Sequence, residues 1–141
     1  MSGFLLDTNV VSELIKPSPE PRVVSWMQAT DESLLYLSVL TIGEIRKGIN
    51  SLPRGHRRAL LESWVGNDLA LRFDQRILPV DFEIAERWGL LSARAKAGGM
   101  LLPVIEGLIA ATALHHNLTL VTRNTKDVQI AGVNLFNPWE P

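Results

Sequence analysis

Four acidic residues of the chain have the types and positions that metal-dependent chemistry requires. Asp7 follows a short apolar run, Glu44 follows a second apolar run through a tight connection, and Glu106 is the one charged residue in the apolar stretch 101–116. Asp127 lies in NTKDV, a segment typical of a surface turn. Burying an unpaired carboxylate is costly, so such groups are usually paired, metal-bound or protonated. The first question is therefore whether these acids share a site.

Three of these acids also have explanations that involve no chemistry. Asp7 can cap the helix predicted from TNVVSELIK, because Asp is a favoured capping residue. Thr41-Ile-Gly-Glu44 fits a capping box, in which the Glu side chain reaches back to the N–H group of the cap. Glu106 lies in the first turn of a helix opened by Pro103, where the helix dipole favours an anion. Taken one at a time, the acids do not establish a site.

The elements predicted around these residues bring several of them to one place. Apolar runs predict strands over 4–6, 34–37, 118–122 and 133–136, and helical spacing predicts helices over 8–16, 22–29, 41–48, 56–71, 82–97 and from 103 onward. This alternation predicts an α/β fold: a three-layer α/β/α sandwich with a mainly parallel central sheet, in a single domain over residues 1–141. Ligands of such folds bind at the carboxyl ends of the strands, which is where we expect the acids.

Carboxylates gathered at one edge of a sheet indicate a bound cation. Without one, the acids would repel each other and raise each other's pKa. The chain has no cysteine, and hard oxygen ligands suit Mg²⁺ or Mn²⁺ better than zinc. Such ions activate water and stabilise charge during displacement at phosphorus. The sequence therefore points to a metal-dependent hydrolase of phosphate esters.

Composition limits the remaining possibilities. The 141 residues include 14 basic and 15 acidic side chains, so any nucleic-acid binding must come from local patches rather than from bulk charge. No apolar run approaches the ~18 residues of a membrane span. The start MSGFLLDTN lacks the basic region of a signal peptide, and the absence of cysteine favours a reducing compartment. We expect a cytoplasmic protein that does not bind membranes.

The chain resembles PIN-domain ribonucleases, specifically the VapC-type toxins of bacterial type II toxin–antitoxin systems and their FitB-like branch. Four segments carry the resemblance, in the family's order: FLLDTNVVSEL, LSVLTIGEIRKGI, LPVIEGLIAATALHHNLTLVTRNTKD and NLFNPW. The resemblance implies an endoribonuclease that hydrolyses RNA with Mg²⁺ or Mn²⁺ and is neutralised by a VapB-like antitoxin. It also implies a homodimer or a toxin–antitoxin hetero-oligomer. By position, the family's metal ligands correspond to Asp7, Glu44 and Glu106.

Two departures from the family pattern leave a second function open. Glu106 occupies a position where the family usually has Asp, and its extra methylene displaces the carboxylate by about an ångström or more, which matters to an ion that requires near-ideal geometry. Asn124 replaces an acid found in some members, which leaves Asp127 or a water to complete the metal shell. The alternative is a catalytically weakened PIN-like module that binds RNA or protein. Restoring Asp at position 106 separates the two.

Polar and basic residues near these acids in the sequence are candidates to orient the carboxylates and to bind RNA. Asn9 and Thr122 are candidates to orient a carboxylate or a water, although turn and cap hydrogen bonds explain them equally well. Candidate RNA-binding residues form a basic cluster between Glu44 and Glu62, and Arg123 is a further one next to the TRN turn. The cluster consists of Arg46, Lys47, Arg54, Arg57 and Arg58. A solvated surface with no ligand is the competing explanation.

Other features have simpler explanations than catalysis. His115 and His116 suggest a metal-free ribonuclease, but adjacent helical residues point in different directions, so a charge at the end of a helix is the better explanation. A phosphatase is disfavoured because the DTN motif lacks the second acid of a D-x-D pair. The tryptophans are expected to pack rather than to stack on bases, with Trp139 holding the C-terminal tail against the body.

Overall fold

Five parallel strands form the central sheet of the chain, which a computed structural model describes over residues 3–141, the side chain of Ile130 excepted. The sheet has the order β3-β2-β1-β4-β5, and the pairs β1·β2, β1·β4, β2·β3 and β4·β5 are all parallel. The strands are β1 (Phe4–Leu6), β2 (Leu35–Ser38), β3 (Ile77–Leu78), β4 (Thr119–Val121) and β5 (Leu135–Phe136). Their carboxyl ends therefore share one edge, as the fold prediction required.

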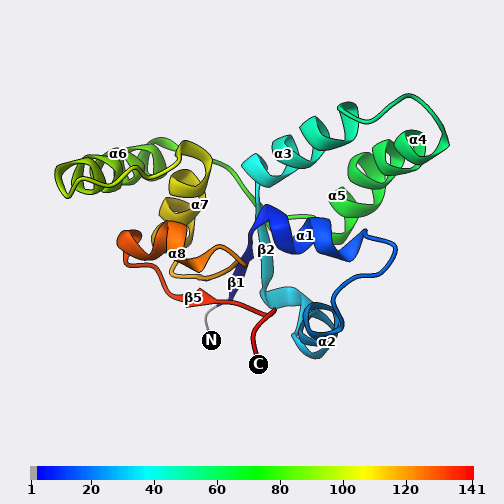
Figure 1. The fold of residues 1–141 in the computed structure, drawn as a ribbon, viewed down its shortest axis with the longest axis horizontal. Helices are drawn as coiled ribbons and strands as arrows, with labels where there is room; N and C mark the ends of the chain where they lie inside the picture. Colours follow the sequence, from blue (N-terminus) through cyan, green and yellow to red (C-terminus); the bar gives the residue numbers. More distant parts are fainter. Residues whose placement is uncertain (1–2) are drawn as a thin grey trace.

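Helices cover both faces of this sheet (Figure 1). One group lies on the face that carries Leu6 and Val121: α1 (Thr8–Leu14), α2 (Pro21–Ala29), α3 (Val39–Asn50), α4 (His56–Ser63), η2 (Trp64–Leu69) and α5 (Ala70–Arg72). The short helix η1 (Glu32–Leu34) leads into β2. The other group is α6 (Phe82–Ala97), α7 (Val104–His115), α8 (Thr125–Val128) and η3 (Gln129–Ala131). None of the helices in the described residues is long and apolar enough to cross a membrane.

Alternation along the strands explains why the core has two halves. Successive side chains of a strand point to opposite faces. Leu5 and Leu120 accordingly pack with α6 and α7, whereas Leu6 and Val121 pack with α1, α2 and α3. The strands are short and buried on both sides, which is typical of a parallel sheet between helical layers. The predicted three-layer sandwich is confirmed.

Most of the predicted elements are confirmed, and the differences lie in short elements and in the ends of helices and strands. The prediction missed β3, because two residues carry no periodicity; β3 pairs with Leu37 and Ser38 of β2. The helix expected from residue 56 to 71 contains a π-helical segment, η2, between α4 and α5. The helix expected from Thr41 begins at Val39, with Ser38 as its cap. Ends and short edge strands depend on local contacts that sequence periodicity does not report.

The tryptophans pack as expected. Trp26 and Trp64 lie against the core half around α1, and Trp88 lies against the half around α7. Trp26 contacts Phe4 edge-on, with ring centroids 5.2 Å apart. Trp139 also packs against the α1 half of the core, so the C-terminal tail is held to the body.

Gly3 is required by the close approach of the chain ahead of β1 to β2. A Cβ atom built on Gly3 would lie 2.6 Å from the backbone oxygen of Leu34 and 2.8 Å from the Tyr36 ring. Because the Leu34 oxygen cannot move aside without displacing η1 and the start of β2, we expect Gly3→Ala to destabilise the fold by about 1–3 kcal/mol. Urea unfolding followed by circular dichroism measures this. Gly43→Ala, at a position with open space for a methyl group, is the control and should not destabilise the fold. Equal stability of Gly3→Ala and the unmodified chain would contradict the prediction.

Candidate active site

Asp7 is the buried acid of the site and lies directly after β1. Its Oδ1 accepts a hydrogen bond from the backbone N–H of Thr8 at 2.8 Å, and its Oδ2 accepts one from the Thr122 hydroxyl at 2.8 Å. The first bond caps α1, so the capping role predicted for Asp7 is confirmed. Burial raises the pKa of Asp7 above its ordinary value, and the charges of Glu44 and Glu106 raise it further against the effect of these hydrogen bonds.

Glu44 is held by α1 rather than by the start of its own helix. Its Oε1 accepts a hydrogen bond from the Thr8 hydroxyl at 2.5 Å, and the Thr8 hydroxyl also lies 3.3 Å from that of Thr41. Helix α3 begins at Val39 and is capped by Ser38, so Glu44 lies five residues into the helix. The alternative that Glu44 serves a capping box with Thr41 is therefore wrong. One carboxylate oxygen of Glu44 has no such bond to Thr8 and remains open to a further ligand.

Glu106 enters the site from the opposite helical layer. It lies in the first turn of α7, after Pro103, which offers no side-chain cap. The Glu106 side chain is partly exposed. Its negative charge is near enough to Asp7 to contribute to the raised pKa of the Asp7 carboxyl. The first turn also carries the partial positive charge of the helix dipole, which favours a carboxylate there. The sheet thus brings together three acids separated by 99 residues of sequence, counted from Asp7 to Glu106.

A hydrogen-bonded network supports Asp7 from behind. Thr122, fully buried, donates to Asp7 and accepts from Asn9 Nδ2 at 3.2 Å and from the backbone N–H of Asn124 at 3.1 Å. Asn9 Oδ1 in turn accepts from the backbone N–H of Arg123 at 3.4 Å. Thr122 therefore lies against the Asp7 carboxylate, and Asn9 is linked to that carboxylate through Thr122. Their role in orienting the carboxylate stays a prediction.

The two other predicted site residues, Asn124 and Asp127, lie on the surface outside the group formed by the three acids. Asn124 is exposed and precedes α8, and its backbone oxygen accepts from the N–H of Asp127 at 3.2 Å. Asp127 is exposed on α8, and the acids that act on the pKa of Asp7 are Glu44 and Glu106. Within the described residues, no three His, Cys, Asp or Glu side chains converge tightly enough to form a ready-made metal cluster. Glu44 and Glu106 act on Asp7 electrostatically, but the three carboxylates do not converge on a common point in this structure.

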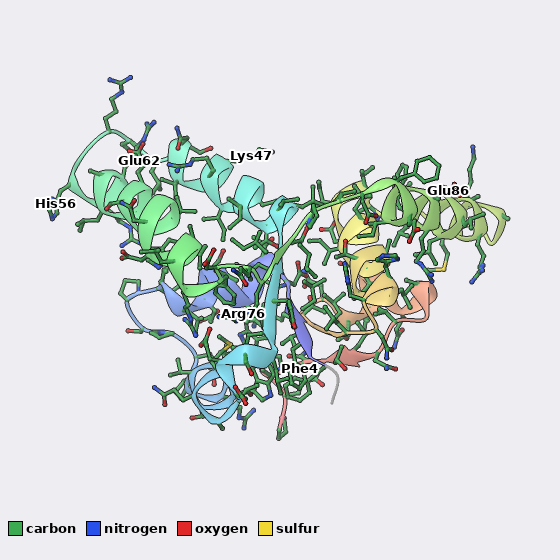
Figure 2. All side chains as sticks on the ribbon, turned by 180° about the vertical axis from the view of Figure 1, so that it is seen from behind. Phe4, Lys47, His56, Glu62, Arg76 and Glu86 are labelled. Atoms are coloured by element: carbon green, nitrogen blue, oxygen red, sulfur yellow. The ribbon has the colours of Figure 1, made fainter. Side chains whose placement is uncertain are left out.

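Basic residues predicted to bind RNA lie along the projecting α3–α4 hairpin. Arg46, Lys47, Arg54 and Arg57 are exposed. Figure 2 shows Lys47 on α3 and His56 at the outer end of the hairpin, well separated from Phe4 in the sheet. Arg58 differs from the others, because its guanidinium lies 3.3 Å from the Leu52 oxygen and 3.5 Å from Glu62. Its side chain holds the α3–α4 connection and is less free to bind a phosphate.

Two site residues were missed by the sequence analysis. Thr8 joins α1 to α3 by donating to Glu44, and Thr41 is buried beside it. Thr8 could have been inferred from its place inside the DTN motif, between two residues that were assigned roles. Thr41 was assigned to a helix cap, and only the position of the helix start corrects that assignment.

The two histidines lie at the other end of α7. His115 is the last residue of α7, about 13 Å along the helix axis from Glu106. Its Nε2 lies 3.6 Å from Glu83 Oε2 on α6, and its ring meets that of His116 edge-on. Burial lowers the pKa of His116, and the charge of His115 lowers it further, so His116 is neutral near pH 7. His116 therefore contributes no charge to the helix end, and the pair lies too far from the acids to share their chemistry.

Comparison with known proteins supports the assignment that the geometry suggests. A family model described as PIN domain matches residues 4–133. The VapC ribonuclease Y4jK of Sinorhizobium fredii is 37% identical over 138 residues, which cover 98% of this chain and 99% of that protein. Toxin FitB of Neisseria gonorrhoeae is 38% identical over 136 residues, covering 96% and 98%.

Solved structures agree with these relatives. The crystal structure of FitAcB from Neisseria gonorrhoeae superposes with a TM-score of 0.93 at 38% identity, covering 98% of this chain and 99% of that chain. A DNA-bound VapBC from Salmonella typhimurium, at 22% identity and a TM-score of 0.77, shares the fold. With the family model spanning most of the chain and both named relatives spanning nearly all of it, this protein belongs to the PIN domain family and, within it, to the VapC-type toxins.

Proposed function

We propose that this chain is a metal-dependent endoribonuclease toxin that hydrolyses RNA phosphodiester bonds. One observation carries the proposal: the sheet brings Asp7, which follows β1, near Glu44 on α3 and Glu106 in the first turn of α7. Burial raises the pKa of Asp7, and the charges of Glu44 and Glu106 raise it further. A divalent cation would offset the repulsion between these like charges. The relatives include proteins named as ribonucleases, which supports RNA as the substrate.

The donor set fits Mg²⁺ or Mn²⁺. All three carboxylates are hard oxygen donors, and the chain has no thiolate to compete for softer metals. Mg²⁺ is usually held by one or two carboxylates with several waters, so the acids need not converge at one point before it binds. The bound ion would supply an activated water and stabilise charge on the scissile phosphate. Thr122 and the backbone of Thr8 orient Asp7, and the hydroxyl of Thr8 orients Glu44.

The test of this proposal is RNA cleavage by the purified protein. Structured RNA is incubated with Mg²⁺ or Mn²⁺ and, in parallel, with a chelator, and the products are separated on a denaturing gel. We expect cleavage within the RNA that depends on the metal. Cleavage that proceeds equally well in the chelator would exclude the metal mechanism.

A binding module without activity is the second candidate. The observation that favours it is the absence, among the described residues, of a ready-made cluster of three metal-binding side chains. The exposed Asn124 adds an amide in place of an acid. In this case the chain would bind RNA or protein without cutting RNA, and the cleavage assay would show no product at any metal concentration.

We propose that the exposed cations of the α3–α4 hairpin bind RNA phosphates. Replacing Arg54 and Arg57 together by Gln should weaken RNA binding at all sequences and reduce the slope of log K against log salt by about 1.4, since each single-strand phosphate contact contributes about 0.7. Fluorescence anisotropy in chelator, from low to moderate salt, measures both quantities. The matched control is Arg87→Gln with Arg94→Gln, which removes the same charge from exposed positions on α6. Equal slopes for the two double variants would contradict the proposal.

We propose that a VapB-like antitoxin restrains the enzyme by lying against α1. Two adjoining hollows of about 190 and 210 Å³ flank α1 and share Ile15 in their walls. The second of them also includes Glu44, so a peptide seated there would reach the acids. A solved relative from Klebsiella pneumoniae, at 25% identity and a TM-score of 0.70, is described as a toxin–antitoxin complex, which supports a hetero-oligomer. A homodimer is the further state we expect. An RNA substrate places the proposed activity in the cytoplasm.

A further inference from the structure

The C-terminal tail returns to the side of the molecule that carries the end of β4. Asn137 Nδ2 lies 3.5 Å from the backbone oxygen of Arg123, and Asn137 Oδ1 accepts from the backbone N–H of Trp139 at 2.8 Å. Arg22 on α2 donates to the backbone oxygen of Trp139 at 3.2 Å. Trp139 itself is partly buried against the core. The tail thus has a fixed path, and its tryptophan has a fixed place.

Arg123 is the residue that this tail holds. The guanidinium carbon of Arg123 lies 5.4 Å from the centroid of the Trp139 ring, within the range of a cation–π contact. The Arg123 backbone is held at both of its polar groups, by Asn9 at the N–H and by Asn137 at the oxygen. The side chain nevertheless remains exposed. An exposed arginine whose guanidinium packs against an aromatic ring and whose backbone is hydrogen-bonded is preorganised to bind an anion.

Arg123 lies beside the acids rather than among them. The preceding residue, Thr122, donates to Asp7, which puts Arg123 next to the site along the chain. The hydrogen bond from Lys16 lowers the pKa of Glu13, on the C-terminal part of α1, and the charge of Arg123 adds a smaller effect in the same direction. The pKa of Asp7 is raised by burial and by the charges of Glu44 and Glu106, and Arg123 is not among its causes. In a bound RNA, the phosphate that contacts Arg123 would therefore be one next to the scissile phosphate, which lies at the acids.

We propose that Trp139 is a positioning residue that holds the Arg123 guanidinium for a phosphate flanking the scissile one in the RNA. This inference rests on the proposed ribonuclease function and adds a phosphate contact to it. Since the contact is made equally before and during the reaction, loss of it should raise KM and leave kcat unchanged. The tail would then contribute to RNA binding although its own side chains need not contact the RNA.

A double-mutant cycle tests the inference. RNA binding is measured by fluorescence anisotropy in chelator for the unmodified chain, for the single variants Arg123→Gln, Trp139→Leu and Trp139→Phe, and for the double variant. The double variant combines Arg123→Gln with Trp139→Leu. We expect Arg123→Gln and Trp139→Leu each to raise Kd about three- to fivefold, the size of an exposed cation–π or phosphate contact. Trp139→Phe, which keeps an aromatic face, should raise Kd less than about twofold. In the Arg123→Gln background, Trp139→Leu should have no further effect.

The outcomes separate this inference from the proposed function. If the unmodified chain neither binds nor cuts RNA, the proposed function fails and the inference fails with it. If the unmodified chain binds and cuts RNA but Trp139→Leu has no effect, or has the same effect with and without Arg123, only the inference is overturned. The second pattern is what a purely structural role for Trp139 would give. A fall in kcat at unchanged KM would also overturn it.

Discussion

Replacing Asp7 by Asn will abolish metal-dependent RNA cleavage and yet stabilise the folded chain in the absence of metal. The activity should fall by about 10³-fold or more, because a bound cation contributes several kcal/mol to such reactions and each 1.36 kcal/mol is a factor of ten. Asn keeps nearly the same shape and can still accept from the Thr8 N–H through Oδ1, so the fold should survive. Its Nδ2 cannot accept from the Thr122 hydroxyl, and the loss of that bond offsets part of the gain in stability. Gel-based cleavage assays and urea unfolding measure the two effects.

The gain in stability should depend on pH in a defined direction. Burial raises the pKa of Asp7 in the folded chain above its value of 3.8 in an unfolded one, so the folded state binds more protons between these values. Stability therefore falls as the pH rises through the folded pKa, and the ionised carboxylate destabilises the fold above it. Asn cannot ionise, so the advantage of Asp7→Asn should be absent below about pH 3.8, grow as the pH rises to the raised pKa of folded Asp7, and stay constant above it. Urea unfolding in chelator across this range measures the difference.

Metal should reverse the order of stability. Mn²⁺ binds the folded, ionised site and should raise the Tm of the unmodified chain with increasing concentration, whereas the Tm of Asp7→Asn should not change. Asp74→Asn, at an exposed position, is the matched control and should keep both the activity and the metal response. A variant Asp7→Asn that still cuts RNA at the original rate would rule out a catalytic role for this carboxylate.

Replacing Glu106 is expected to give the second largest effect. Glu106→Gln removes one of the two charges that act on Asp7 while keeping the length of the side chain, and should lower the cleavage rate about 100-fold, equivalent to about 2.7 kcal/mol. It should also lower the raised pKa of Asp7, because a like charge is removed. Steady-state cleavage at saturating Mn²⁺ measures the rate. Glu86→Gln, on the exposed face of α6, is the matched control.

Glu106→Asp distinguishes the two functions proposed above. If the longer side chain is accommodated by this site, shortening it should change the rate by less than about tenfold, since the partly exposed carboxylate in the first turn of α7 can adapt through its rotamers and bound water. A large gain of activity in Glu106→Asp, starting from an inactive chain, would instead identify Glu106 as the residue that disables the site. The two results lie far enough apart for a single assay to decide.

Much of the molecule could be inferred from local sequence patterns. The helix 82–97 was predicted with the ends that the structure shows, because Ile84, Leu91 and Ala95 recur on one face and Gly98 follows. The strand at 4–6 was likewise predicted, since a short apolar run ends at a polar residue. Asp7 was inferred to be special because it follows such a strand. These patterns depend on neighbours within a few residues, which the sequence displays directly.

Other features depend on contacts between segments far apart in the sequence. The hydrogen bond from Thr8 to Glu44 joins α1 to α3, and the contact of Arg123 with Trp139 joins the end of β4 to the C-terminal tail. No periodicity reports these pairings, because they arise only when parallel strands align their carboxyl ends.

By itself, the sequence determined most of the strands and longer helices, their order along the chain, and which acids to consider as site residues. The tertiary structure alone decided that Ser38 rather than Thr41 caps α3, and that Glu44 and Glu106 act on Asp7 while Asp127 lies apart on α8. The physical reason is that secondary structure follows from local backbone and side-chain preferences. A carboxylate's pKa and ligands, by contrast, are set by the burial and charges that packing brings to it.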